Sequence, residues 1–266
     1  MSTQAKVIVL RTAGTNCNSE TAFAFARCGA VVEEVHLERL FSGKVHLADY
    51  HIMALPGGFS YGDDIASGRL FANELRLRLG QDVRRFIDDG KLVIGICNGF
   101  QILVKAGILP GPFKPATHRQ SVTLTHNDSG KFEARWVHLK VEGRSVWTEG
   151  LKDIVYFPVA HGEGKFIPAD KKTLQALGHS GQVAFRYVDE NGADALYPQN
   201  PNGSLEAIAG ITDPTGRVLG LMPHPERHFT HTQHPYWTRF GHPDQPGDGA
   251  RIFQNGVDYA TRTFCA

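Results

Sequence analysis

The strongest constraint on the fold is a series of short, almost wholly apolar segments that alternate with amphipathic ones in the first hundred residues. Segments that are apolar throughout are typical of strands buried on both faces, and their alternation with helices is typical of a parallel sheet covered on both sides. Strands are expected at 6–11, 31–37, 50–55 and 92–96, and helices at 20–28, 72–87 and 99–105. Asn18 or Ser19 is expected to cap the first helix and Gly29 to end it.

The second half of the chain has a different pattern. Apolar and polar residues alternate through much of 122–188, which predicts antiparallel strands. The composition of 198–203 predicts a loop, 218–222 a last apolar strand, and 252–261 a closing helix. No internal repeat or linker is evident. We therefore expect a single α/β domain over 1–266, with a mostly parallel central sheet, helices on both faces and antiparallel β elaborations.

Composition argues against several classes of protein. A formal net charge of +1 gives no electrostatic footprint for nucleic acid or an anionic membrane. No apolar stretch approaches the roughly 20 residues needed to cross a bilayer. The four cysteines form no C-x-x-C pair, and no secretory signal opens the sequence. We expect free thiols, no metal site and a cytoplasmic location.

The segment Gly95-Ile96-Cys97-Asn98-Gly99 lies between a predicted strand and a predicted helix. It has the glycine-flanked pattern of a nucleophile elbow, in which a sharp turn lifts the central residue above the sheet and crowds its neighbours. The turn would also place the sulfur of Cys97 at a helix amino terminus, where the dipole favours a thiolate. A buried, inert cysteine is the alternative. Packing or surface roles are expected for the cysteines without this pattern, which are Cys17, Cys28 and Cys265.

A cysteine hydrolase also needs a base and a group that orients the base. Pro225 biases His224 toward an extended conformation, in which His224 and Glu226 point to the same side. The carboxylate can then bond one imidazole nitrogen and leave the other for the thiol. Alone, the pair could be an ordinary turn, but beside a cysteine elbow each motif supplies what the other lacks.

Backbone N–H groups that could stabilise an oxyanion follow two of the predicted strands. The Gly57-Gly58 turn comes directly after 50–55, and Asn98 follows Cys97. In an elbow, the residue after the nucleophile contributes such an N–H group. A plain tight turn is the alternative for the glycine pair.

Taken together, these motifs resemble the triad-type glutamine amidotransferases, and among them the glutaminase family of phosphoribosylformylglycinamidine synthase. The resemblance covers nearly the whole chain, in order and spacing. The matching segments are GTNC (14–17), ALPGGFSYGD (54–63), GICNGFQ (95–101), HNDSG (126–130), PVAHGEG (158–164), YPQNPNGS (197–204) and GLMPHPER (220–227).

This resemblance implies a flavodoxin-like amidotransferase fold and a set of site residues. Cys97 would be the nucleophile that forms a thioester with L-glutamine, His224 the acid and base, and Glu226 its orienter. Gly58 and Asn98 would form the oxyanion hole. Three further positions match family motifs: Gln101 would lie near the substrate, and His161 and Glu163 would contact substrate or partner.

The family resemblance also implies a partner. Ammonia would pass to a synthetase subunit that uses ATP and Mg²⁺ to convert formylglycinamide ribonucleotide to formylglycinamidine ribonucleotide in purine synthesis. The resemblance also allows a small third subunit in the complex. No cofactor is expected in this chain, which also lacks a G-x-x-x-x-G-K-[ST] loop. Two alternatives stay open: a stand-alone cysteine amidase or peptidase, and a non-catalytic regulatory subunit.

The tail from about residue 228 is longer than expected for a small free-standing member of the family. Through Trp237, Gly247 and 252–253 it resembles the end of the large fused synthase. A metal site is one reading of its irregularly spaced histidines, but a polar docking loop is the preferred one. These histidines are His228, His231, His234 and His242.

Overall fold

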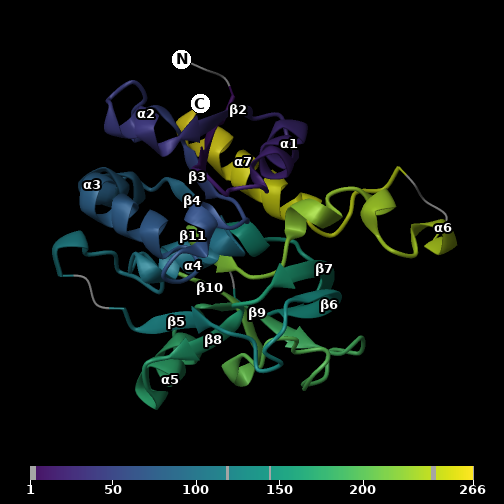
Figure 1. The fold of residues 1–266 in the computed structure, drawn as a ribbon. Helices are drawn as coiled ribbons and strands as arrows, with labels where there is room; N and C mark the ends of the chain where they lie inside the picture. Colours follow the sequence, from purple (N-terminus) through teal and green to yellow (C-terminus); the bar gives the residue numbers. More distant parts are fainter. Residues whose placement is uncertain (1–3, 118–119, 144, 241–243, 266) are drawn as a thin grey trace.

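The computed structural model describes residues 4–117, 120–143, 145–240 and 244–265. Its central feature is a nine-stranded sheet with the strand order β2-β1-β3-β4-β11-β10-β9-β6-β7 (Figure 1). In that order the strands are β2 (Val31–His36), β1 (Lys6–Arg11), β3 (Ile52–Leu55), β4 (Leu92–Ile96), β11 (Val218–Leu221), β10 (Ile208–Thr212), β9 (Val183–Val188), β6 (Glu133–Val141) and β7 (Ile154–His161).

The first five strands in this order are parallel, and every residue of β3, β4 and β11 is buried. Their apolar sequences follow from this position, because both faces of each strand are covered. The predicted strands agree with the structure to within two residues. The one-residue difference at the end of β2 arises because Leu37 begins the short helix α2 (Leu37–Phe41).

From β11 to β7 the neighbouring strands are antiparallel. Buried residues alternate along β7, as the sequence pattern predicts for a sheet with one covered face. A separate antiparallel pair, β5 (Val122–Thr125) and β8 (Lys165–Pro168), lies against α4 (Asn98–Lys105). Phe166 of this pair stacks on Phe100 of α4 with 6.5 Å between ring centroids.

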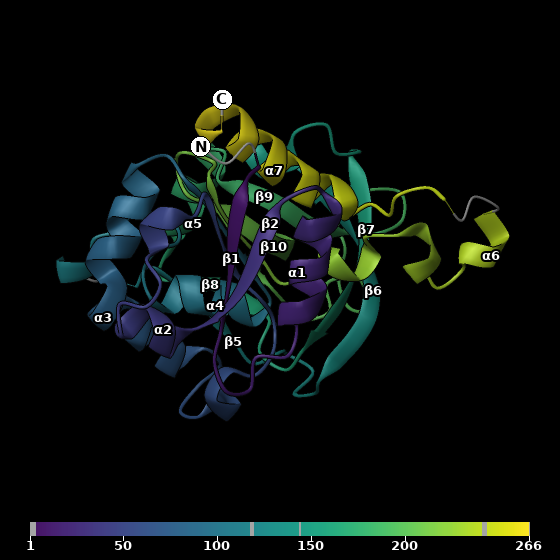
Figure 2. The same ribbon diagram turned by 90° about the horizontal axis from the view of Figure 1, so that it is seen from above.

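Helices cover both faces of the parallel half. Figure 2 shows α1 (Asn18–Arg27) on one side of β1 and β2, and α3 (Arg69–Asp88) on the other. The closing helix α7 (Ala250–Phe264) packs beside α1, where Phe25 and Phe253 meet edge to face at 5.0 Å. On the opposite side α3 packs against α4. The predicted α/β class, with helices on both faces of a mostly parallel core and antiparallel additions, is confirmed.

Some elements differ from the sequence prediction. The predicted cap of the first helix is wrong, because Cys17 occupies the N-cap position, and its side chain makes no capping hydrogen bond. Helix α5 (Lys171–His179) was not predicted; it buries one residue, Leu177, so its apolar stripe is weak. Strand β10 was also missed, since Gly210 interrupts its apolar run.

After β11 the chain forms a short 3-10 turn, η6 (Pro225–His228), and then leaves the body of the molecule. This excursion carries α6 (Trp237–Phe240) and projects from the rest of the fold before the chain returns to α7 (Figure 1). Among the described residues, no helix has the length and apolar character needed to cross a membrane.

Candidate active site

Three neighbouring parallel strands, β3, β4 and β11, end at the same edge of the sheet. In the strand register Leu55 pairs with Gly95, and Ile96 pairs with Leu221. The segments that follow these strands therefore emerge side by side, at the carboxyl edge where α/β proteins place their sites. These segments contain the three predicted motifs, which are the Gly57-Gly58 turn, the Cys97 elbow and the pair of His224 and Glu226.

Cys97 adopts the strained turn expected of an elbow. Its φ of 53° and ψ of −106° are rare for a residue with a side chain, and it occupies the N-cap position of α4. Its backbone N–H donates to Leu221 O at 2.8 Å, which ties the turn to β11. The flanking glycines are sterically required: a Cβ on Gly95 would lie 2.6 Å from Gly99 O, and one on Gly99 would lie 1.8 Å from Leu55 O.

His224 and Glu226 form the predicted pair. His224 is extended, with φ −105° and ψ 91°, and its Nδ1 donates to Glu226 Oε1 at 2.6 Å. Both residues are 1% exposed. Burial opposes protonation of the imidazole, but the Glu226 carboxylate and the Cys97 sulfur outweigh it and raise the pKa of His224 well above its ordinary value. Among the described residues, His224 Nε2 has no hydrogen-bond partner.

The glycine turn lies directly against this pair. A Cβ on Gly57 would be 2.8 Å from His224 Cε1 and 3.4 Å from Cys97 Cβ. Gly58 has a φ of +136°, and a Cβ there would meet the Asn16 backbone nitrogen at 2.7 Å. Neither Gly58 nor Asn98 has a recorded partner for its N–H group in the described part of the chain. Their assignment to the oxyanion hole stays a prediction.

The Asn98 and Gln101 side chains connect three segments. Asn98 Oδ1 accepts from Ser60 Oγ at 2.6 Å, and its Nδ2 donates to Gln101 Oε1 at 2.9 Å. Gln101 Nε2 donates in turn to Glu163 O at 2.6 Å. Both amides are buried and bonded within the protein, so they fix the loop at 56–63 and the β7–β8 turn relative to α4.

His161 is the last residue of β7, and Glu163 lies in the turn between β7 and β8. Ala160 O lies 3.7 Å from Cys97 Sγ. His161 is buried, and burial together with the positive charge of nearby His224 lowers the pKa of His161 to about 4. Glu163 pairs with the buried ammonium of Lys105 at 3.8 Å. The structure thus places His161 next to Ala160, which contacts Cys97, and Glu163 against Lys105 and Gln101 of α4. Contact of His161 and Glu163 with substrate or partner stays a prediction.

Sequence reasoning missed a second thiol beside His224. Cys17, at the start of α1, is buried and accepts a hydrogen bond from Arg227 Nη2 at 3.1 Å. Arg227 Nε also donates to Glu20 Oε1 at 2.9 Å. Burial raises the pKa of Cys17, while the neighbouring His224 and Arg227 act in the opposite direction. The GTNC segment was recognised as a family motif, which was the available signal for this position.

The tail histidines take part in ring packing. His228 Nδ1 donates to Tyr156 O at 2.7 Å, and its ring lies edge-on to Trp136 at 5.2 Å. His234 lies 5.7 Å from the same Trp136 ring. The described residues bring one group of three or more potential ligands together, and it contains none of these histidines. His242 lies outside the described residues.

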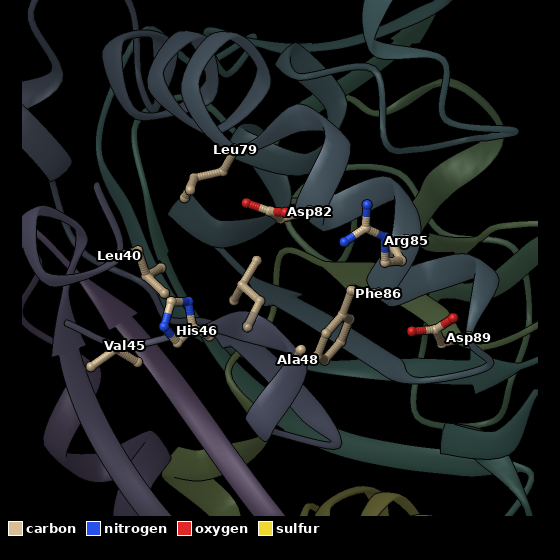
Figure 3. A pocket seen from close by; sticks show the side chains of 10 residues that line it. Leu40, Val45, His46, Ala48, Leu79, Asp82, Arg85, Phe86 and Asp89 are labelled. Atoms are coloured by element: carbon tan, nitrogen blue, oxygen red, sulfur yellow. The ribbon is translucent and has the colours of Figure 1, made fainter. Parts of the chain in front are cut away.

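A pocket of about 210 Å³ lies between α2, the segment at 45–48 and α3 (Figure 3). It is separate from the site at the strand ends, because its lining contains none of the residues described above. The lining residues are Leu40, Val45, His46, Leu47, Ala48, Leu79, Asp82, Arg85, Phe86 and Asp89.

The class of protein follows from a family comparison. A family model described as the CobB/CobQ-like glutamine amidotransferase domain matches residues 4–260. The match includes the three strand ends and the α1 segment that form the site. The chain is therefore a glutamine amidotransferase.

Comparison with individual relatives shows which family of glutamine amidotransferases the chain belongs to. A Dehalococcoides mccartyi protein named phosphoribosylformylglycinamidine synthase subunit PurQ is 48% identical over 260 residues, covering 97% of this chain and 98% of the relative. An Archaeoglobus fulgidus protein of the same name is 43% identical over 269 residues, with 96% and 97% covered. The chain belongs to this PurQ family, as the sequence motifs predicted. A structure of PurLQS from Thermotoga maritima agrees, with a TM-score of 0.72 and 31% identity over 96% of this chain and 99% of that one.

Proposed function

We propose that this chain is the glutaminase subunit of a phosphoribosylformylglycinamidine synthase, and that Cys97 is its nucleophile. One observation carries the proposal: Cys97 occupies a strained turn at the carboxyl edge of the sheet, beside the hydrogen-bonded His224–Glu226 pair. A nucleophile, a base and an orienting carboxylate are the groups that amide hydrolysis through a thioester requires.

In the proposed reaction the Cys97 thiolate attacks the side-chain carbonyl of L-glutamine. The backbone N–H groups of Gly58 and Asn98 hold the oxyanion, and the His224 imidazolium gives a proton to the amide nitrogen, which leaves as ammonia when the C–N bond breaks. Neutral His224 then takes a proton from water, which attacks the thioester and releases glutamate. Glu226 keeps the Nδ1 proton in place through both steps.

The ammonia would pass to a synthetase subunit that binds ATP and Mg²⁺ and forms formylglycinamidine ribonucleotide, with a small third subunit as a possible further component. Two features support a dependence on such a partner. Relatives carry the name of a synthase subunit, and Cys97 is 6% exposed in this structure. Ala160 O of β7 lies 3.7 Å from the Cys97 sulfur, so we expect β7 or the turn after it to move when glutamine binds.

Glutamine hydrolysis by the purified chain, measured with and without a synthetase of this family, tests the proposal. We expect low turnover alone and a rise of about tenfold or more with the synthetase and its nucleotide substrate. Full activity without the synthetase would support the stand-alone amidase alternative. No turnover with the assembled complex would support a non-catalytic subunit.

Replacing Glu226 with Gln should change how activity depends on pH. The substitution removes the carboxylate charge that raises the pKa of His224, so the imidazolium acid is lost at lower pH. We expect kcat to fall by roughly 10²- to 10⁴-fold and the basic limb of the kcat/KM profile to move to lower pH. An unchanged basic limb, measured in the complex, would argue against His224 as the acid.

The same substitution should change the pH dependence of stability. The pKa of His224 is higher in the folded state than in the unfolded chain. The interaction of His224 with Glu226 therefore makes its full contribution to stability when the pH is below 6.5, the ordinary pKa of histidine. That contribution is lost as the pH rises through the folded-state pKa. The melting temperature of the wild type should therefore fall as the pH rises from 6.5 through the folded-state pKa of His224. The fall should be smaller in Glu226→Gln, which lacks the carboxylate charge.

A further inference from the structure

A compact set of metal-binding side chains lies next to the proposed catalytic pair. One ligand atom from each of Cys17, Glu20, His224 and Glu226 lies within 4.8 Å of the others. Two of these residues come from the start of α1 and two from the segment after β11, so the fold holds them from both sides. The group combines a sulfur, an imidazole nitrogen and two carboxylates, which is a donor set suited to Zn²⁺.

A second observation points to a ligand at this place. Glu226 Oε2 is buried and has no hydrogen-bond partner among the described residues, and Glu226 as a whole is 1% exposed. Buried polar atoms are nearly always satisfied, so this unpartnered carboxylate oxygen in the ligand cluster marks a place where a bound cation would be stabilised.

Arg227 already supplies a positive charge here. Its Nη2 donates to Cys17 Sγ at 3.1 Å and its Nε to Glu20 Oε1 at 2.9 Å. The Arg227 side chain is 35% exposed, so its guanidinium can turn toward solvent. A cation that binds the cluster would therefore compete with this guanidinium.

We propose that this cluster is an inhibitory site for a thiophilic divalent cation of the Zn²⁺ type, which binds by displacing the Arg227 guanidinium. The cation replaces the thiol proton of Cys17 and any proton on the His224 nitrogen that it ligates, and these protons pass to solvent. A metal-bound His224 cannot give a proton to the departing amide nitrogen or take one from water. The inhibition rests on the proposed glutaminase function, whereas the binding does not.

Titration of the full-length chain with Co²⁺ under a non-chelating reductant tests the binding directly. Thiolate ligation gives a charge-transfer absorption band, and Zn²⁺ should abolish the band by displacing Co²⁺. We expect Cys17→Ser to weaken binding by about tenfold or more, and Arg227→Met to strengthen it by a similar factor because the competing cation is removed. The matched control Cys265→Ser should bind as the wild type does.

The Cys97→Ala variant distinguishes metal binding by the cluster from metal binding by the Cys97 thiol. It should keep the Co²⁺ band, because Cys97 is not part of the ligand cluster. The proposal is overturned if Cys97→Ala loses the band while Cys17→Ser keeps it, or if the wild type shows no band. Weaker binding by Arg227→Met would also contradict it. None of these readouts depends on glutamine turnover, so they remain informative even if the proposed function is wrong.

Discussion

Substitution of Cys97 by alanine is expected to abolish glutamine hydrolysis, with a loss of at least roughly 10³-fold in kcat. No other described side chain occupies the elbow position, and without the sulfur the thioester cannot form. The fold should survive, since alanine is tolerated where the strained backbone is already held by Leu221 and α4. Turnover of glutamine by the assembled complex is the measurement, with circular dichroism as the check on folding.

Cys28→Ala is a matched control for this variant, because Cys28 lies at the end of α1 and is half-buried but takes no part in the site. It should keep wild-type turnover. A Cys97→Ala enzyme that retained more than about a tenth of wild-type turnover would rule out thioester catalysis at this residue.

Substitution of Gly99 by alanine is expected to have the largest effect on stability. The added methyl group would lie 1.8 Å from Leu55 O and 2.6 Å from Leu55 C, which belong to the buried strand β3. Neither the strand nor the first turn of α4 can yield without disturbing the core. Overpacking of this kind costs about 3 kcal/mol or more, which should lower the melting temperature by roughly 6–12 °C.

Gly178→Ala is the control for this prediction. Gly178 lies in α5, and a Cβ there would meet nothing within 4 Å. Alanine should therefore raise the melting temperature slightly or leave it unchanged, because it favours the helix by up to about 1 kcal/mol. Equal melting temperatures for Gly99→Ala and the wild type would show that the contact between α4 and β3 can accommodate an added methyl group.

Local sequence patterns predicted much of the fold and the geometry of the core of the site. The wholly apolar runs located the parallel strands, because burial on both faces leaves no room for polar residues. Pro225 predicted the extended backbone at His224, and with it the same-side placement of Glu226. The distance of 2.6 Å between Nδ1 and Oε1 agrees with that placement. The single-domain organisation over 1–266 and the role of the tail from about 228 stay predictions.

The place of Cys17 in the site and the burial of Cys97 could not be predicted, because both depend on contacts between segments that are distant in the sequence. Arg227 reaches Cys17 across 210 positions, and this contact exists only because α1 packs against η6, the turn that follows β11. The burial of Cys97 has a similar origin, since Ala160 comes from the antiparallel half of the sheet. Neither strand order nor loop packing can be read from the periodicity of one segment.

Covalent labelling of the assembled complex by an electrophilic glutamine analogue tests the central claim most directly. We predict one adduct per chain, located on Cys97 by peptide mass spectrometry, prevented by excess glutamine and absent from Cys97→Ala. Cys17, whose sulfur lies within 4.8 Å of a His224 nitrogen, is an internal control that should stay unmodified. An adduct on Cys17, or no adduct in a complex that turns over glutamine, would contradict the assignment of Cys97 as the nucleophile.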